Sequence, residues 1–370
     1  MSKVLITGGA GFIGSHIADY LYKSGYFIRI LDNLNPKTHN GVWPDYLNEN
    51  YELVYGDVNC RDTLLSALKD VEYIIHMAAE MDLNPEFQKF INTNVGSTAL
   101  IYELIQKNKL EIKKVLIAST QFVYGEGRWF CEKYGKFYPD SREISQLKDK
   151  KWEVIHPKSN LSSKYLKCKE DQIVNPPNHY ALSKYFQEQF SLKIGKLYGI
   201  PTDCMRFSIV HGIRQSLKNT YSGALRTFSF FTHLDLPFST FEDNLSRRDF
   251  ISVYDAANAV KIILENNEKP YQIFNIAGDQ SYSVLDLAKM VCNSFDKKIK
   301  FNNNIEFRRG DIRHAISCNS KIKALGWEPR HSEQEAVKEY VKWFKTQNLD
   351  TSKFLKTQKI IRENGQILSV

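Results

Sequence analysis

A glycine-rich turn near the N-terminus constrains the fold of this chain more than any other feature of its sequence. Residues 4–6, Val-Leu-Ile, form an apolar run, and Gly8, Gly11 and Gly14 follow it at close spacing. An amphipathic stretch over residues 13–24 comes next. A chain that turns sharply from a strand into a helix, and packs its backbone closely there, needs residues without side chains. The turn therefore predicts a strand, a tight turn and a helix at the start of the fold.

Apolar runs and amphipathic stretches continue to alternate through the first half of the chain. We expect strands at residues 28–31, 52–55, 73–76 and 114–118, and helices at residues 62–68 and 95–107. This alternation predicts an α/β protein with a Rossmann-type, doubly wound parallel sheet. After residue 200 the pattern becomes irregular, which indicates a smaller C-terminal substrate-binding lobe over the carboxyl ends of the strands.

Charge and hydropathy argue against several classes of protein. The 370 residues carry a net charge of +8, and no block of like charges marks a nucleic-acid-binding arm. No apolar run is long enough to span a membrane, and the N-terminus lacks the pattern of a cleavable signal. We therefore expect no nucleic-acid partner, no membrane partner and a cytoplasmic location.

The cysteines predict neither disulfides nor a metal site. The chain has six cysteines, spread along its length without a CxxC pair, so we expect free thiols in a reducing compartment. A metal centre at Cys131, His156 and Cys168 would lack the fourth good ligand that a closed zinc site needs. We expect no metal.

The glycine turn also points to a dinucleotide cofactor. The N–H groups at the start of the helix can bind a pyrophosphate that approaches the glycines closely. Asp32 ends the second predicted strand about twenty residues further on, where an acid hydrogen-bonds the adenosine ribose and repels a 2′-phosphate. We therefore expect NAD rather than NADP. The alternatives are a plain tight turn for the glycines and a turn-initiating pair for Asp32 and Asn33.

Two further loops are expected to line the cofactor. Asp57 and Val58 follow the third predicted strand and are placed to meet the adenine. Ala78 and Ala79 follow the fourth predicted strand and are small enough to lie alongside a bound cofactor.

Tyr180 and Lys184 are the candidate catalytic pair. They are spaced by one helical turn, so on a helix they share a face. An ammonium beside a phenol stabilises the phenolate, lowers the tyrosine pKa from its usual value of about 10 and makes the tyrosine usable as a base. A chance surface pair is the alternative, because Tyr-x-x-x-Lys alone is a weak pattern.

These segments together resemble the extended short-chain dehydrogenase/reductase family, which contains nucleotide-sugar epimerases and dehydratases. The resemblance covers roughly residues 3–344 and rests on residues 7–14, 32–33, 56–58, 76–79, 118–125, 180–184, 248–251 and 310–314. Other segments are similar to dTDP-L-rhamnose 4-epimerase and its relatives within that family: residues 32–36, 123–127, 215–219, 221–223 and 241–243, and the insertion after residue 127.

The resemblance implies a role for each matched residue. Tyr180 would be the general base, Lys184 its electrostatic partner, and Thr120 would hydrogen-bond a sugar hydroxyl. The implied cofactor-binding residues are Gly8, Gly11, Phe12, Ile13, Gly14, Asp32, Asn33, Asp57, Val58, Ala78, Ala79, Asn94, Tyr180 and Lys184. The implied substrate-binding residues are Thr120, Gln121, Asn219, Arg248, Arg308 and Asp311, with the two arginines on the substrate diphosphate. A strand-end hydroxyl for Thr120 and a local Arg248–Asp249 ion pair are the alternatives.

The residues after Thr120 separate the activities found in such a family. The 4,6-dehydratases carry an Asp-Glu pair there, which supplies acid and base for the loss of water. This chain has Gln121 and Phe122, neither of which ionises. We therefore expect an NAD-dependent 4-epimerase of a nucleotide-diphosphate sugar, of the dTDP-6-deoxyhexose type. The alternatives are a 4-dehydrogenase or 4-ketoreductase with the same residues, and a non-catalytic NAD-binding sensor.

The expected organisation has three parts. Residues 1–200 form the NAD-binding domain, interrupted at about residues 126–178 by an insertion that we expect to have little regular structure. Residues 201–345 form mainly the substrate-binding lobe, with the chain crossing back, and residues 346–370 form a polar tail or frayed helix. The resemblance also implies a homodimer paired through the helices near residues 95–107 and 180–198.

Overall fold

The computed structural model describes residues 2–370 except 83–84, 160, 162, 220–222 and 309. Its centre is a seven-stranded sheet in the order β14-β9-β5-β4-β1-β2-β3, in which every neighbouring pair is parallel. The strands are β1 (Lys3–Thr7), β2 (Phe27–Asp32), β3 (Glu52–Tyr55), β4 (Tyr73–His76), β5 (Lys114–Thr120), β9 (Thr202–Phe207) and β14 (Ile273–Ile276). The predicted doubly wound α/β fold is confirmed.

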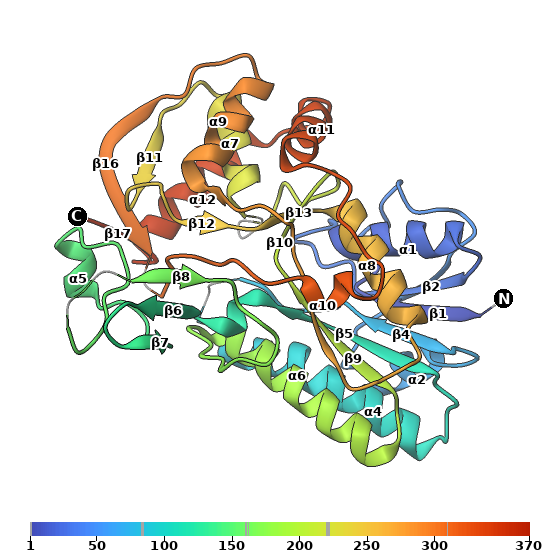
Figure 1. The fold of residues 1–370 in the computed structure, drawn as a ribbon. Coiled ribbons are helices and arrows are strands. Elements are labelled where there is room, and N and C mark those ends of the chain that lie inside the picture. Colours follow the sequence, from blue (N-terminus) through green and yellow to red (C-terminus); the bar gives the residue numbers. More distant parts are fainter. Residues whose placement is uncertain (1, 83–84, 160, 162, 220–222, 309) are drawn as a thin grey trace.

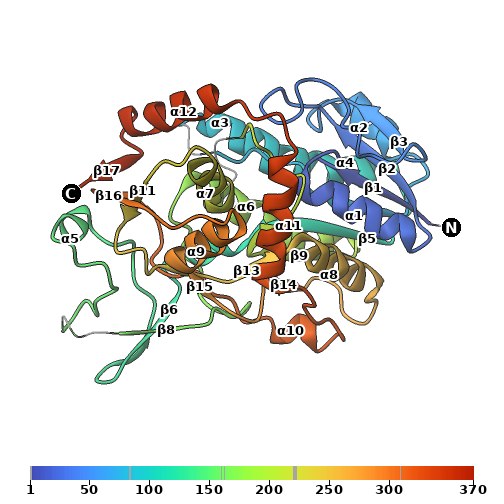
Figure 2. The ribbon, with the colours of Figure 1, turned by 90° about the horizontal axis from the view of Figure 1, so that it is seen from above.

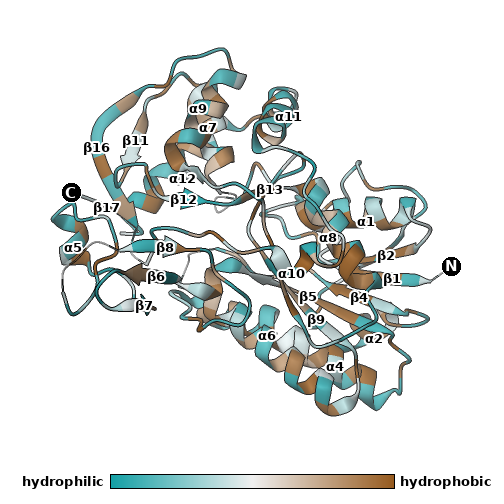
Figure 3. Cartoon of the chain, in the orientation of Figure 1, coloured by the Kyte–Doolittle hydropathy of each residue, from teal (hydrophilic) through white to brown (hydrophobic). Residues whose placement is uncertain are grey.

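Helices cover both faces of this sheet (Figure 1). Helices α1 (Phe12–Lys23) and α8 (Val253–Glu265) pack on one face. Helices α2 (Arg61–Ala67), α4 (Ser97–Lys107) and α6 (His179–Tyr198) lie on the other. In Figure 3 the hydrophobic colour gathers in the sheet and on the helix faces turned toward it. Burial on both faces explains the apolar runs in the central strands β1, β4 and β5.

The strand order reverses between β1 and β4. From β1 the chain steps outward to β2 and β3, and it then returns to the other side of β1 to add β4, β5, β9 and β14. In an open parallel sheet the carboxyl edge at such a reversal is where ligands bind. The glycine turn follows β1, and residues 77–79 follow β4, so both segments lie at that edge.

A second lobe lies over the carboxyl edge of the sheet (Figures 1 and 2). Its helices are α7 (Gly223–His233), α9 (Val284–Ser294) and α11 (Glu333–Lys345), which share one apolar core. Strands β11 (Phe238–Phe241) and β16 (Phe301–Arg308) pair in parallel beside them. Because β9, α8 and β14 belong to the sheet layer although they follow residue 200, we propose that the chain crosses back into the first domain at these elements.

Short elements connect the two layers. Strands β10 (Ile209–His211) and β13 (Phe250–Ser252) pair in parallel, and β12 (Arg247–Arg248) and β15 (Tyr282–Ser283) pair antiparallel. Short helical segments include α3 (Phe87–Phe90), the π-helical η1 (Ile91–Gly96), the 3₁₀ segment η2 (Gln121–Tyr124) and α10 (Ser320–Lys323).

The described part of the insertion contains only short regular elements, separated by longer irregular segments. Strands β6 (Arg128–Cys131), β7 (Gly135–Phe137) and β8 (Lys164–Leu166) form an antiparallel sheet in the order β7-β6-β8, and α5 (Ile144–Lys148) follows β7. Trp129 is buried at its centre with its ring 5.3 Å from that of Tyr165. These strands are three or four residues long and rich in charge, so they lack the apolar run that marks a strand in a sequence.

The C-terminal segment is more ordered than a tail. Helix α12 (Thr351–Glu363) begins at Asp350, whose carboxylate accepts a hydrogen bond from the Lys353 N–H. Strand β17 (Ile367–Ser369) then pairs antiparallel with β16. The Phe354 ring stacks on Phe230 with centroids 4.4 Å apart, so α12 completes the core of the second lobe. Among the described residues, none of the helices has the length and apolar character needed to cross a bilayer.

Candidate active site

The glycine turn fits a bound pyrophosphate. Gly8 has φ +66°, and a Cβ added to it would lie 2.7 Å from the Ala78 nitrogen. A Cβ on Gly14 would lie 2.5 Å from the Gly8 carbonyl oxygen. Gly11 caps α1 without a side-chain hydrogen bond to its first turn, so the N–H groups of Phe12 and Ile13 have no side-chain cap and are the kind of donors that phosphates bind at a helix start.

Asp32 is fixed at the end of β2. One carboxylate oxygen accepts from the Ala10 N–H at 3.1 Å, and the other accepts from the Leu34 N–H at 2.9 Å. Burial raises the carboxyl pKa, and these two backbone donors oppose that rise. Each oxygen keeps a lone pair for a ribose hydroxyl, so the position suits the 2′,3′-diol of NAD.

The remaining predicted cofactor residues surround the same edge. The Asn33 amide donates to the Asp57 carboxylate at 3.0 Å, which joins the loops after β2 and β3, and Val58 is buried beneath them. The Ala78 N–H donates to the Thr7 hydroxyl at 3.2 Å, so the segment that contains Ala79 runs directly past the glycine turn.

Asn94 holds this segment from the other side. Its side-chain oxygen accepts from the Glu80 N–H at 2.9 Å, and its Nδ2 donates to the Glu80 carbonyl at 3.2 Å and to the Ser183 hydroxyl at 2.8 Å. Asn94 lies in the π-helical turn η1 and is fully buried. Since both amide hydrogens are used within the protein, we propose that Asn94 positions the cofactor loop and α6 rather than contacting NAD.

Tyr180 and Lys184 lie on the buried face of α6. The helix begins at Asn178, whose side chain accepts from the Ala181 N–H at 2.9 Å, so Tyr180 falls in the first turn. Tyr180 is 9% exposed and Lys184 is 2% exposed. The pair is therefore part of the interior and not a surface pair. Helix α6 packs against β5 and η2, which brings Tyr180 toward the end of the strand that carries Thr120.

A buried relay holds the Lys184 ammonium. Its Nζ donates to the Gln187 side-chain oxygen at 2.5 Å, and the Gln187 Nε2 donates to the Thr98 hydroxyl at 2.8 Å. Burial lowers the pKa of Lys184 to about 7, opposed by the nearby Cys204 and Glu188. A lysine with this pKa exchanges its proton near neutral pH, which suits a partner of a catalytic phenol.

Thr120 ends β5 at the same edge as the glycine turn. Its hydroxyl accepts from the Phe122 N–H at 3.3 Å. Gln121 turns inward, where its side-chain oxygen accepts from the Ser317 hydroxyl at 3.2 Å and its amide lies beside Asp249. Burial raises the pKa of Asp249 to about 8. These contacts make Gln121 a link between β5 and the second lobe.

The predicted diphosphate-binding residues lie in or just after strands β12 and β16. Arg248 donates from Nη2 to the Ile312 carbonyl at 2.8 Å and pairs with the Asp311 carboxylate at 3.4 Å, so the expected alternative, an ion pair with Asp249, does not form. The Arg308 guanidinium lies 5.3 Å from the Phe241 ring centroid. Its Nε is buried, and no described residue accepts a hydrogen bond from it, as expected for a donor that awaits an anionic ligand. Asn219 lies in the loop after β10, where its N–H donates to the Ser216 hydroxyl.

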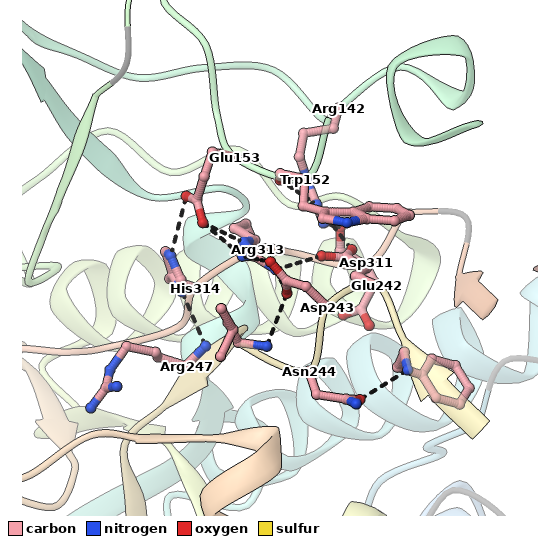
Figure 4. Close-up of polar contacts among 12 residues, drawn as sticks. Arg142, Trp152, Glu153, Glu242, Asp243, Asn244, Arg247, Asp311, Arg313 and His314 are labelled. Atoms are coloured by element: carbon pink, nitrogen blue, oxygen red, sulfur yellow. Dashed lines mark hydrogen bonds and ion pairs between the residues drawn. The ribbon is translucent and has the colours of Figure 1, made fainter. Parts of the chain in front are cut away.

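A buried ion network underlies this end of the site (Figure 4). Arg142, from the insertion, pairs with Glu126 and Glu242 at 2.9 Å each and donates to the Asp311 carbonyl at 3.2 Å. Arg313 pairs with Glu242 at 2.9 Å, and also with Asp243 and Glu153. Both arginine side chains are at most 2% exposed. The network ties the insertion to the second lobe beside Asp311.

The sequence pattern missed these supporting residues. Gln187 and Ser183 share the α6 face with Tyr180 and Lys184, so helical spacing is the signal that locates them. Glu126, Glu242 and Arg313 fall inside segments that carry the family resemblance, but Arg142 lies in the insertion without a motif. The residues with which Arg142 interacts are remote from it in sequence, so no local pattern predicts these contacts. Among the described residues, no three or more His, Cys, Asp or Glu side chains gather as a metal site would require.

The fold and this site define a class of protein. A glycine turn, an acid at the end of the second strand, and a buried Tyr-Lys pair beside a strand-end threonine describe a nicotinamide-dependent enzyme of the short-chain dehydrogenase/reductase type. Two family models match the chain: GDP-mannose 4,6 dehydratase over residues 5–141, and the NAD dependent epimerase/dehydratase family over residues 154–277.

Similarity to a relative places the chain in that family. The dTDP-L-rhamnose 4-epimerase of Burkholderia thailandensis is 32% identical over 357 residues, which cover 94% of this chain and 96% of the relative. The chain therefore belongs to the NAD-dependent epimerase/dehydratase family and is an enzyme whose cofactor is NAD. The residues of the glycine turn and Asp32 fit that cofactor.

Solved structures agree with this placement. The UDP-glucose 4-epimerase of Thermotoga maritima, determined with UDP-glucose, superposes with a TM-score of 0.74 at 26% identity and covers 93% of this chain and 98% of its own. The UDP-N-acetylglucosamine 4-epimerase of Methanobrevibacter ruminantium, in complex with UDP-N-acetylmuramic acid, gives a TM-score of 0.74 at 25% identity, covering 94% and 99%.

Proposed function

We propose that this enzyme is a 4-epimerase of a nucleotide-diphosphate sugar. The observation that supports the proposal is that Thr120 ends β5 at the carboxyl edge of the sheet, and that α6, which carries Tyr180 and Lys184 on its buried face, packs against β5 and η2. Of the two arginines predicted to bind the diphosphate, Arg308 has a buried Nε from which no described residue accepts a hydrogen bond, and its planar fork of donors matches phosphate oxygens. The Nη donors of Arg248 are used by the Arg247, Ile312 and Arg313 carbonyls and by the Asp311 carboxylate.

The residues divide the chemistry between them. Tyr180 takes the proton from the sugar 4-hydroxyl, and the Lys184 ammonium stabilises the phenolate. Thr120 hydrogen-bonds the 4-oxygen and keeps it near Tyr180. Bound NAD supplies the hydride acceptor and donor at C4. After the 4-keto sugar has turned over in the pocket, the proton returns from Tyr180 to the new 4-oxygen, so the reaction has no net redox change.

The residues after Thr120 argue against dehydration. Loss of water from C5 and C6 needs a second acid and base near the sugar. Gln121 does not ionise and is engaged with Ser317, and Phe122 carries no polar group. The matches to dehydratases therefore reflect the shared fold and cofactor site.

We propose a dTDP-6-deoxyhexose as the substrate. The support is the 32% identity to a dTDP-L-rhamnose 4-epimerase across nearly the full length of both chains. Other relatives act on UDP sugars, such as the UDP-glucose 4-epimerase of Thermotoga maritima, so the nucleotide is the first variable to test.

One experiment separates the candidate activities. The purified protein, with whatever nucleotide it retains, is incubated with dTDP-, UDP- and GDP-sugars, and the products are resolved by chromatography. We expect an epimer of a dTDP-6-deoxyhexose without added NAD. Stoichiometric NADH with a 4-keto product would instead identify a 4-dehydrogenase. Bound NAD without turnover of any sugar would favour a non-catalytic sensor.

We also propose that two copies associate through α6 in the cytoplasm. Leu182 and Phe186 are spaced by one turn of α6 and are 40% and 45% exposed. Phe87 and Ile91 add exposed apolar surface beside them on α3 and η1, which pack against α6. Apolar side chains that gather on one exposed face favour a protein interface.

A further inference from the structure

The connection between β2 and β3, residues 33–51, is tied to the glycine turn. The Tyr46 hydroxyl donates to the Ala10 carbonyl at 2.6 Å. Ala10 is fully buried inside the turn, and its N–H donates to Asp32. Ala10 is therefore held on one side by the strand that binds the adenosine ribose and on the other by Tyr46. Neither contact follows from the glycine pattern itself.

Arg214, from the second lobe, contacts both Tyr46 and helix α1. Its guanidinium lies 4.6 Å from the centroid of the Tyr46 ring. It also pairs with the Asp19 carboxylate at 2.8 Å and donates to the Ser15 hydroxyl at 3.3 Å. Ser15 and Asp19 are spaced by one turn of α1 and share a face. Arg214 thus connects Tyr46 to α1, the helix that follows the glycine turn.

The backbone conformation of Arg214 indicates that these contacts hold the residue in place. Arg214 has φ +66°, a left-handed conformation that costs a non-glycine residue free energy and persists when surrounding contacts hold it. The same loop continues to Asn219, a predicted substrate-binding residue. A loop of the substrate lobe is therefore fastened directly to the cofactor-binding helix.

We propose that Tyr46 and Arg214 form a clasp that slows the dissociation of NAD. The clasp contacts a carbonyl of the turn and two side chains of α1, so it resists the loosening of turn and helix that release of a pyrophosphate requires. Retention matters in an epimerase, because the cofactor that takes the hydride must stay to return it. Tyr46 and Arg214 are positioning residues, since neither contacts a reacting atom.

The test measures how fast labelled NAD leaves the protein when unlabelled NAD is added in excess. Tyr46→Phe removes one hydrogen bond and keeps the ring, so we expect dissociation to become about threefold to tenfold faster. Arg214→Met removes the stacking and the ion pair together, and we expect a larger effect of roughly tenfold or more. Arg214→Lys keeps the charge but not the planar group and should fall between.

The control is Tyr20→Phe. Tyr20 also lies on α1, and its hydroxyl donates to the Asn258 side chain of α8 at 3.0 Å, remote from the turn. It should leave the dissociation rate unchanged. Thermal unfolding of the NAD-free variants shows whether each remains folded. Equal rates for wild type, Tyr46→Phe and Arg214→Met would overturn the proposal, as would an equal acceleration by Tyr20→Phe. The readout involves no sugar, so failure of the proposed epimerase activity leaves this test intact.

Discussion

The burial of Lys184 lowers the free energy of unfolding of the NAD-free protein, and it gives the lysine a pKa that suits the proposed reaction. In the folded protein burial lowers its pKa from 10.5 to about 7. Between these values the unfolded chain binds a proton that the folded chain does not, so stability rises with pH across this window and falls as the pH is lowered through it.

Lys184→Met should reveal this cost. We expect the free energy of unfolding of the NAD-free variant to exceed that of wild type by an amount that grows as the pH is lowered from 10 to 7. The measurement is urea denaturation at several pH values. Lys151→Met serves as the control, because Lys151 lies in an exposed pair with Asp149 and should give a difference that does not change with pH. A difference for Lys184→Met that is also constant would contradict the account.

The Tyr180 hydroxyl is assigned the proton transfer. Tyr180→Phe keeps the ring in its buried position and removes only the transferring group. We expect kcat to fall by about 10²–10⁴-fold, while the NAD content of the purified protein stays at the wild-type level. Product formation by Tyr180→Phe within threefold of wild type would exclude Tyr180 as the base. Tyr198→Phe, at the exposed end of the same helix, is the matched control.

For single residues, the sequence predicts the candidate cofactor-binding and catalytic groups, but fewer of the residues that hold those groups in place. The glycines, Asp32 and the Tyr180–Lys184 pair follow from local spacing, because each acts within one turn or helix. Gln187 lies one turn beyond Lys184 on α6, but the Gln187–Thr98 and Asn94–Ser183 hydrogen bonds depend on how α6 packs against α4 and η1. Those contacts join residues far apart in the chain, and no local pattern encodes them.

We propose that the insertion supports the substrate site. Arg142 pairs with Glu126 within the insertion and anchors it to Glu242 and the Asp311 carbonyl. Removal of the guanidinium leaves two buried carboxylates without this cation, which typically destabilises a protein by about 3–5 kcal/mol. It also frees the segment that carries Asp311, which we propose to bind the substrate.

Arg142→Met should therefore act on substrate binding as well as on stability. We expect a raised KM for the nucleotide sugar, about tenfold if one charge-assisted hydrogen bond to substrate is lost, with NAD content unchanged and a smaller change in kcat. Steady-state kinetics and urea denaturation measure both effects. Lys114→Met breaks another buried pair, with Asp203 at 3.3 Å, at the opposite end of β5 from Thr120. It should lower stability and leave KM unchanged. An unchanged KM in Arg142→Met would refute the positioning role.

Some elements follow from the local sequence pattern alone. The strands predicted at residues 52–55 and 73–76 match the structure end to end. The strands of the insertion depend on one another and on residues 316–318, to which Cys168 is hydrogen-bonded. Strand β17 likewise forms because β16 is there to pair with it. A pairing of this kind stabilises segments whose own sequences do not favour a strand.

On the scale of the whole molecule, the two lobes are linked because the chain passes from the sheet into the second lobe and back again. Strand β14 returns to the sheet after the second lobe has begun, and the site forms where the lobes meet. The sequence pattern indicates that the chain after residue 200 is irregular, but it does not indicate which segments return to the sheet. Those segments are set by the long-range packing of α8 against α1 and of β14 against β9.

The exposed face of α6 predicts the state of association. Phe186→Glu places a charge in the centre of the apolar patch, and we expect it to convert a dimer into a monomer by light scattering. Val42→Glu introduces the same charge at another exposed apolar residue, 62% exposed and outside the patch, and should leave the mass unchanged. A monomeric wild type, or a dimeric Phe186→Glu protein, would show that α6 is not the interface.

In the proposed reaction, the hydride that leaves C4 of the sugar returns to C4 while the sugar and NAD both stay bound to the same enzyme molecule. The most direct test supplies a dTDP-6-deoxyhexose deuterated at C4 to protein without added NAD and follows the product by mass spectrometry. The account predicts an epimer that retains the deuterium, with no accumulation of NADH. Deuterium recovered in released NADH, together with a 4-keto sugar, would contradict it and identify a dehydrogenase.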